Sequence, residues 1–344
     1  MTADAAERFD RFVDRALYGP DGFYERGGRA GRGGDFLTAV EVGPLFGEVT
    51  ALALDSWWAG LGRPDPYMVV EGGAGRGQWC RMVRAAEPAC ASALTWVAVE
   101  RSQRLRSEAA QVADATAAEL PDQHAAELPD QHAAELPDQH AAALRGGAAH
   151  VVLANELLDN LAVRLLRRTA GGWSELFVQS GAPLWRPTAD VPPFEVPEGS
   201  TAPWQLAARD WVERARGLLA PGGRLVCLDY CSTTAELARR PATEWLRTYA
   251  RHGRGTEPWT KPGEQDITCE VCHDQLGHPL VTAQAAWLAG HGLDELVDEG
   301  RRLWRERAHR PDLAAVKGRS RVSEAAALTD PTGMGSFQVL EWLA

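Results

Sequence analysis

The chain carries a glycine-rich stretch at positions 69–77, with the sequence VVEGGAGRG. Two β-branched residues lead into an acid and a turn, and the apolar residues that follow are spaced as on one face of a helix. Those residues are Trp79, Met82, Val83 and Ala86. The stretch therefore predicts a strand, a glycine turn and a helix. Glycine lets a backbone come close to a ligand, and a helix N-terminus offers free N–H groups with a partial positive charge.

A second acid follows the next predicted strand. Positions 96–99 read WVAV and lead into Glu100, where a carboxylate can accept hydrogen bonds from two ribose hydroxyls. Glycine turns of this kind bind dinucleotides and S-adenosylmethionine (SAM). Because the motif does not open the chain and Glu71 ends the first strand, SAM is the first choice and a nicotinamide cofactor the second. A tight turn without a ligand is the third alternative, and the two acids disfavour it.

The length and charge of the chain limit the function classes. A chain of 344 residues is compatible with two domains or one large decorated domain. The apolar runs are too short for a membrane span, and the acidic start has no signal-peptide pattern, so we expect a cytoplasmic protein that does not enter membranes. The net charge of −11 argues against nucleic acid as a partner and slightly favours a cationic substrate.

The six cysteines are expected to be free thiols in a reducing compartment. Cys269 and Cys272 have the spacing of a metal-binding pair, and His273 follows them. A structural zinc ion needs four ligands, and the chain has no second pair of this kind. The same spacing arises for two neighbours on a strand. We therefore predict no metal site.

Polar residues also end a third predicted strand. The run from His150 to Ala154 leads into Asn155, Glu156 and Asp159. Polar groups at the carboxyl end of a parallel strand face the ligand crevice of an open α/β sheet. The alternative is a helix start, in which Asn155 caps the helix and the acids favour its dipole. Both interpretations are compatible with the sequence.

Positions 117–140 contain three identical copies of the octapeptide AAELPDQH. The eight-residue period with a proline in each copy matches no known solenoid, and the identity of the copies indicates tandem duplication. Each copy offers little apolar surface to offset the entropy of ordering it. We expect a surface excursion that catalysis does not need.

The other segments predict a regular α/β chain. Apolar spacing predicts helices from Phe9 to a stop at Pro20 and over Leu45–Trp58, and an intervening loop at positions 33–47 carries two acids, a hydroxyl and aromatic residues. The further expectations are a hairpin at 163–178, an irregular segment with six prolines at 183–203, a helix at 204–219, a strand at 224–230, loops at 245–268, helices at 284–288 and 293–307, and a last strand at 337–342.

Five motifs occur in an order that resembles one known family. They are Tyr18-Gly19-x2-Gly22-Phe23-Tyr24, the segment from Gly34 to Gly47, Glu71-x-Gly73-x-Gly75-x-Gly77, Asn155-Glu156-x2-Asp159-Asn160-Leu161, and Pro262-Gly263-x-Gln265-Asp266-Ile267-Thr268. Together they resemble the MidA-like SAM-dependent methyltransferases. That family includes the mitochondrial complex I assembly factor, a protein arginine methyltransferase. One departure is Ala39-Val40, where the family commonly has Ser-Pro.

The resemblance implies a class I SAM-dependent methyltransferase, with a Rossmann-like, mostly parallel seven-stranded sheet. Residues 1–62 would form an N-terminal cap and residues 63–344 the SAM-binding core, with insertions at 117–140, 162–203 and 241–310. The residues implied for binding SAM, or its product S-adenosylhomocysteine, are Glu71, Gly73, Gly75, Gly77, Glu100, Asn155 and Glu156. Gly34, Asp35, Thr38 and Glu41 would close over the cofactor.

The resemblance also suggests which residues would act on the methyl acceptor. Methyl transfer needs a nucleophile held in line at about 3–3.5 Å and little acid–base help. If the acceptor is a guanidinium, carboxylates would orient it and take up its proton, because its planar fork pairs with them bidentately. The candidates are Glu156, Asp159 and Glu41, with Asp229 and Asp266 in reserve.

Three functions stay open at this point. The first is a protein arginine methyltransferase, as the mitochondrial member of the family is. The second, which bacterial members of the family could be, is an N- or O-methyltransferase that acts on free arginine or a specialised metabolite. The third is a non-catalytic SAM-binding assembly factor, which the intact motif residues disfavour. A homodimer is compatible with the sequence.

Overall fold

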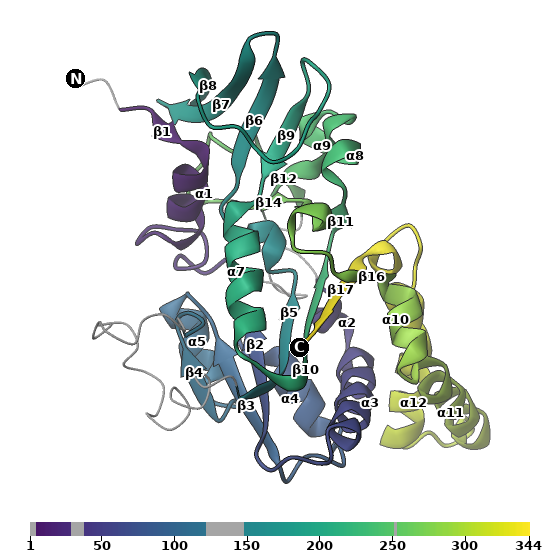
Figure 1. The fold of residues 1–344 in the computed structure, drawn as a ribbon. Coiled ribbons are helices and arrows are strands. Elements are labelled where there is room, and N and C mark those ends of the chain that lie inside the picture. The colour runs from purple at the N-terminus through teal and green to yellow at the C-terminus, as the bar shows by residue number, and fades with distance from the viewer. Residues whose placement is uncertain (1–4, 29–37, 122–147, 251–252) are drawn as a thin grey trace.

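The computed structural model describes residues 5–28, 38–121, 148–250 and 253–344. Its centre is a seven-stranded sheet in which five parallel strands lie next to one another and two further strands extend one edge (Figure 1). In spatial order the strands are β16 (Leu280–Ala283), β17 (Gln338–Leu343), β10 (Leu219–Asp229), β5 (Ala149–Asn155), β2 (Tyr67–Gly72), β3 (Leu94–Val99) and β4 (Ala115–Ala117).

The sheet is mixed rather than all parallel. β17 pairs antiparallel with both β10 and β16, whereas the pairs from β10 to β4 are parallel. The expected mostly parallel sheet of seven strands is therefore confirmed for its five-stranded part, and the edge around β17 departs from it. The structure provides the two layers of helices that such a sheet needs on its faces.

The alternation of side chains along β2 shows how both faces are covered. Tyr67 and Val69 are buried in one core, and Met68 and Val70 in the other, as the two-residue period of a strand requires. The first core is covered by α3 (Pro44–Gly60) and α4 (Gln78–Ala85). The second is covered by α7 (Leu206–Gly217). A short helix, α5 (Gln103–Ala109), follows β3.

A second, antiparallel sheet of five strands lies beside the first (Figure 1, top). It consists of β1 (Glu7–Arg8), β7 (Gly172–Gln179), β6 (Arg164–Thr169), β9 (Thr201–Trp204) and β8 (Ala182–Thr188). The predicted hairpin is confirmed as β6 and β7, and the predicted opening helix as α1 (Phe9–Tyr18).

The prediction that positions 183–203 are irregular is wrong for β8 and β9. Pro183 and Pro187 lie in β8, which among the described strands pairs with β7 alone. A strand at a sheet edge tolerates proline, because the missing N–H leaves no ladder bond unmade.

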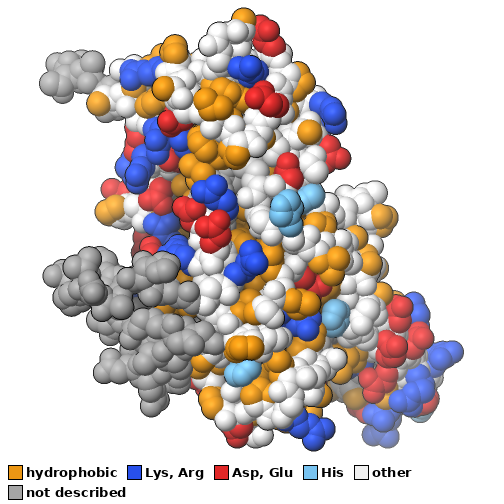
Figure 2. All heavy atoms as spheres, in the orientation of Figure 1, with side chains coloured by type: hydrophobic (Ala, Val, Ile, Leu, Met, Phe, Trp, Pro, Cys, Tyr) orange, Lys and Arg blue, Asp and Glu red, His pale blue; other side chains and the backbone are white. Residues whose placement is uncertain are grey.

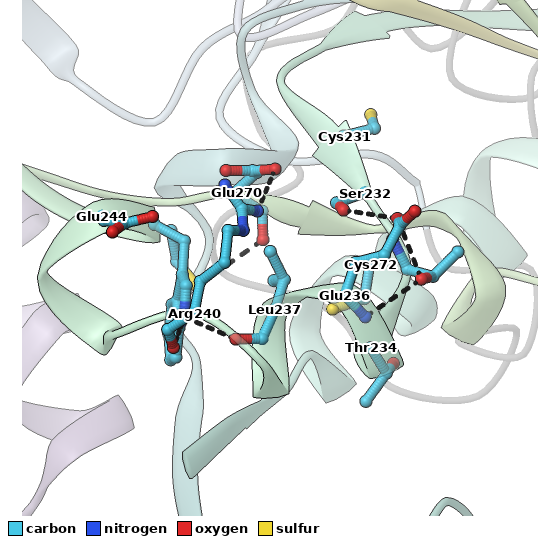
Figure 3. A network of polar contacts seen from close by, with 12 residues as sticks. Cys231, Ser232, Thr234, Glu236, Leu237, Arg240, Glu244, Glu270 and Cys272 are labelled. Atoms are coloured by element: carbon cyan, nitrogen blue, oxygen red, sulfur yellow. Dashed lines mark hydrogen bonds and ion pairs between the residues drawn. The ribbon is translucent and has the colours of Figure 1, made fainter. Parts of the chain in front are cut away.

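The segment at positions 245–268, predicted to form loops over the sheet edge, and the residues on either side of it contain short regular elements. A three-stranded sheet is formed by β12 (Leu246–Ala250), β13 (Gly253–Arg254) and β14 (Asp266–Cys269), and a two-stranded one by β11 (Cys231–Ser232) and β15 (Val271–Cys272). α8 (Thr234–Ala238), α9 (Ala242–Trp245) and η2 (His273–Gln275) connect them. Figure 3 shows the polar network that joins these pieces, in which Arg240 donates to Glu270 over 2.7 Å.

Cys269 and Cys272 lie on two different short strands, β14 and β15, and both are buried free thiols. The last part of the chain contains α10 (Gln284–Gly290), α11 (Leu293–Arg307), α12 (Leu313–Leu328) and η3 (Met334–Ser336). Charged side chains of both signs crowd the hairpin of α11 and α12 (Figure 2, lower right). Within the described residues, no helix has the length and apolar character needed to cross a membrane.

Candidate functional site

A pocket opens at the carboxyl ends of β5, β2 and β3, which are neighbours in the sheet. It encloses about 800 Å³ of empty space, part of it open to solvent. The sequence-predicted residues that line it are Thr38, Glu41, Glu71, Gly73, Gly75, Glu100, Asn155 and Glu156. Residues far apart in the sequence thus meet at one site because parallel strands end at the same edge.

Other predicted residues lie elsewhere. Gly77 is outside the pocket lining, and it adopts the left-handed conformation, with φ 73°, at the start of α4. A Cβ at this position would lie 2.6 Å from a methyl of Val112, so this glycine serves helix packing. Asp159, Asp229 and Asp266 also do not line the pocket. Gly34, Asp35 and positions 122–140 lie outside the described residues.

The glycine turn has the backbone that glycine favours. Gly73 and Gly75 both have positive φ angles, of 65° and 53°. A side chain on Gly73 would meet Leu157 at 3.0 Å, whereas one on Gly75 would meet nothing within 4 Å. Because Gly75 lines the pocket, the open space beside it is room in which a ligand can approach the backbone.

The Glu100 carboxylate is held in a fixed orientation at the end of β3. The N–H of Gly75 donates to its Oε2 over 2.9 Å, and the N–H of Ser102 donates to its Oε1 over 2.8 Å. Burial nevertheless raises the pKa of this carboxyl, because desolvation disfavours the charged form. The turn and the acid therefore form one unit, in which the loop after β2 orients the acid after β3.

Glu71 is tied to the neighbouring strand. Its Oε2 accepts a hydrogen bond of 2.8 Å from the indole N–H of Trp96, and its side chain is almost fully buried. Burial raises its pKa to about 8, and the Trp96 bond opposes that shift only in part. At neutral pH this carboxyl is therefore mostly protonated, and it can donate as well as accept.

Glu156 occupies an unusual position directly after β5. Its φ angle is 49°, in the left-handed region that non-glycine residues rarely adopt, and such residues cluster at functional sites. Its Oε1 accepts from the N–H of Ala39 over 3.0 Å and from the amide of Asn155 over 3.2 Å. Burial first, and the charge of Asp159 second, raise its pKa to about 8.

Asn155 has an unsatisfied atom at this site. Its Oδ1 is buried and has no hydrogen-bond partner within the described residues, and Asn155 lines the pocket. A buried acceptor without a donor is costly, so the position suits a ligand that brings an N–H or O–H group.

The predicted helix start after β5 is wrong. Only a single 3₁₀ turn follows, η1 (Leu158–Asn160), and Asn155 does not cap it. The acid that holds this turn is Asp229 at the end of β10, which accepts from the N–H groups of Leu158 (2.9 Å) and Asp159 (3.3 Å). The Asp159 carboxyl is buried beside Asp229, and burial followed by that neighbouring charge raises its pKa.

The pocket also contains residues to which sequence reasoning gave no role. Tyr18, Tyr24 and Asn160 line it, and the Tyr24 hydroxyl lies 3.1 Å from both Asn160 Oδ1 and Asp266 Oδ1. The amide of Asn160 also donates to Asp266 over 3.0 Å. The tyrosines and Asn160 stand inside quoted motifs, but motif membership alone does not say which side chains meet. Arg76, within the glycine motif, is a further lining residue.

The raised pKa values predict a pH dependence of stability. Glu71, Glu156 and Asp229 have pKa values of about 8 when folded, against about 4 when unfolded, so the folded state retains protons that the unfolded state has lost. This contribution is complete below pH 4 and disappears as the pH rises through 8. We expect the free energy of unfolding, measured by urea titration, to fall between pH 5 and 8. Glu71→Gln should flatten part of the slope, and a flat parent profile would contradict the expectation.

Comparison with known proteins identifies the family. Residues 49–290 match the family model of the S-adenosyl-L-methionine-dependent methyltransferases. The chain belongs to this MidA-like methyltransferase family. It is thus a SAM-dependent methyltransferase, and SAM is its methyl donor.

A crystal structure of a Burkholderia thailandensis protein bound to S-adenosyl-homocysteine resembles this methyltransferase with a TM-score of 0.73 and 25% identity, covering 98% of this chain and 88% of that one. A native structure from the same organism has a TM-score of 0.71 at 23% identity, covering 99% and 88% of the two chains. Both comparisons support the class I methyltransferase fold.

Two curated relatives are mitochondrial proteins named as protein arginine methyltransferases. NDUFAF7 homolog of Drosophila melanogaster is 42% identical over 62 residues, which cover 18% of this chain and 14% of the relative. NDUFAF7 of Danio rerio is 36% identical over 67 residues, which cover 19% and 16%. The matched segments are therefore a small part of each relative.

Proposed function

We propose that this methyltransferase transfers the methyl group of SAM to an arginine guanidinium on a protein. The observation that carries the proposal is the buried carboxylate of Glu156 at the end of β5, in a pocket that three more acids line. Burial raises the pKa of Glu156 to about 8, and a guanidinium that binds beside it stabilises the ionised form and pairs with it bidentately. The names of the two mitochondrial relatives support the same acceptor.

We assign the cofactor to the end of the pocket near β2 and β3. Glu100 is the acceptor for the ribose hydroxyls, and the turn with Gly73 and Gly75 gives the ligand backbone access. The buried Oδ1 of Asn155, which has no hydrogen-bond partner within the described residues, can accept a hydrogen bond from an amino group of the ligand. This unsatisfied acceptor is the observation that supports the fit of SAM to the pocket. When bound, SAM supplies an electrophilic methyl group on a sulfonium.

We assign Glu156 to the acceptor, where it orients the guanidinium and takes up the proton that methylation releases. Its hydrogen bonds from Ala39 and Asn155 fix the carboxylate before the acceptor arrives, so less ordering is needed on binding. Asp159, buried beside Asp229, acts on Glu156 through its charge and does not touch the acceptor.

We further propose that residues 1–62 act as a cap on a core of residues 63–344. Tyr24 contacts Asn160 and Asp266, and the N–H of Ala39 donates to Glu156, so this segment contacts the core in the stretch after β5 and at Asp266. Thr38 and Glu41 line the pocket from the cap.

The test of the acceptor uses SAM with a radioactive methyl group. The parent and the Glu156→Gln variant are incubated with cell extract and, separately, with its small-molecule fraction. We expect label in protein, and acid hydrolysis of that protein should release methylated arginine, in the parent reaction alone. Label in the small-molecule fraction would overturn the protein acceptor in favour of free arginine or a metabolite. Label in neither would favour a non-catalytic SAM-binding role.

A further inference from the structure

A groove runs along the hairpin of α11 and α12 and shares no lining residue with the pocket at the strand ends. It encloses about 1600 Å³ of empty space, part of it open to solvent. Its apolar lining residues are Trp304, Val316, Val322 and Ala326. Val316 is 52% exposed. An apolar groove on a protein surface indicates a site that a partner covers.

The other face of the hairpin is attached to the core. Arg321 donates to Glu48 of α3 over 2.8 Å, and the Glu324 carboxylate accepts from the N–H of Leu45 over 2.9 Å. Arg321 and Glu324 are three residues apart and lie on a different side of α12 from the groove residues. The hairpin is therefore a fixed element with one covered face and one open face.

Four charged residues on the groove side of α11 form a palindromic pattern. They are Asp294, Asp298, Arg301 and Arg305, which occur at i, i+4, i+7 and i+11 and therefore lie on one face of the helix. All four are exposed, and the last three line the groove. The spacings are the same from either end of the pattern, and the signs are opposite. A second α11 that lies antiparallel to the first thus brings each acid opposite an arginine, Asp294 to Arg305 and Asp298 to Arg301.

Within one copy these charges are poorly paired. Arg301 donates to Asp298 over 2.9 Å, but their side chains are 57% and 72% exposed, and such a surface pair contributes little. For Asp294 and Arg305 the structure shows no ion pair within the described residues. Early acids and late bases also suit a helix dipole, but that effect is confined to the terminal turns, and Asp298 and Arg301 lie in the middle of α11. A second copy provides the partners that a single copy lacks.

We propose that α11 of a second copy of this chain lies antiparallel in the groove, which makes the enzyme a two-fold symmetric homodimer. In such a dimer the same patch of both copies meets, so each contact occurs twice. The four helices form an antiparallel bundle, in which Trp304 of one copy reaches the end of the other copy's groove that Val322 and Ala326 line. The ion pairs flank this apolar contact. The surface lies apart from the pocket, so the inference holds whichever acceptor the enzyme uses.

The test exchanges the charges of one predicted pair between two copies. Sedimentation velocity of the parent at micromolar concentrations should give a mass about twice the 37.3 kDa of the chain. Asp294→Arg and Arg305→Asp each place like charges opposite each other at both ends of the interface, so each should raise the Kd of the dimer by roughly tenfold or more. An equimolar mixture of the two variants, one of them fluorescently labelled, should form a heterodimer with a Kd near that of the parent, because every acid again faces an arginine.

Glu213→Arg is the matched control, since Glu213 is an exposed acid in an i,i+4 pair with Arg209 on α7, outside the groove lining. It should keep the parent's dimer. The exchanged side chains are exposed, so both reversal variants should melt near the parent. If one melts early, the same exchange at Asp298 and Arg301 provides a second mixture. A monomeric parent, a dimer that the reversals leave unchanged, or a mixture that stays as weak as its components would overturn the proposal.

Discussion

Glu156→Gln is expected to lower the rate of methyl transfer by about 10²–10⁴-fold, the usual contribution of a positioned acid–base group. Glutamine has nearly the same shape and still accepts from Ala39, but it can neither pair with a cation nor take its proton. The fold and the Kd of S-adenosylhomocysteine should therefore stay close to those of the parent. Initial rates with labelled SAM, together with calorimetry, measure the two effects separately.

The pH profile provides a second readout for the same residue. Because the pKa of Glu156 is about 8, its carboxylate predominates only above that pH, so the rate of the parent should rise as the pH passes through 8. The glutamine variant should lack this rise. Glu264→Gln, in an exposed loop before β14, is the control and should keep both rate and profile. Full turnover in Glu156→Gln would show that this acid only supports the turn after β5.

Glu100→Ala is expected to weaken S-adenosylhomocysteine by about 1.5–3 kcal/mol, or roughly 10–150-fold, because the ribose hydroxyls lose a charged acceptor. Calorimetry measures the loss. Methylthioadenosine keeps the ribose and lacks the amino-acid end, and its affinity for the Glu100→Ala variant should fall by the same factor. That common loss would show that Glu100 acts on the ribose rather than on the amino-acid end of the ligand.

The glutamine variant Glu100→Gln controls for the two backbone N–H groups that the carboxylate also satisfies. It keeps an acceptor for one of them, so its melting temperature should stay closer to the parent's than that of the alanine variant. Unchanged affinity in Glu100→Ala, or tight NAD binding by the parent, would contradict the assignment.

The sequence was sufficient to predict the residues at the strand ends, because the two-residue and 3.6-residue periods locate the strands and helices around them. Parallel strands then bring Glu71, Glu100 and Glu156 to one edge without any knowledge of the remaining fold. The same reasoning cannot say where a side chain points after the strand ends. Asp159 lies in a 3₁₀ turn, and hydrogen bonds from the backbone of that turn to Asp229 hold it away from the pocket.

Other features depend on contacts between segments that are distant in the sequence, so local sequence patterns do not predict them. α12 was not predicted, because its face is built from alanine and glycine, and Gly318 packs against Gly300 of α11 without side chains between them. β8 carries prolines that normally indicate a loop, and only its place at a sheet edge makes them acceptable. The contact of Arg76 with Glu41 joins the glycine turn to the short helix α2 (Ala39–Val42), and their approach follows from tertiary packing.

The contact of Tyr24 with Asn160 and Asp266 has a consequence for the order in which the chain is made. Tyr24 is synthesised first, Asn160 later and Asp266 last of the three, and Asp266, from outside the pocket lining, forms hydrogen bonds with both lining residues. A nascent or prematurely ended chain that stops before β14 thus has the glycine turn and its acids but lacks the residue that Tyr24 and Asn160 share. This part of the pocket wall therefore reaches its final hydrogen bonding only after β14 has been synthesised.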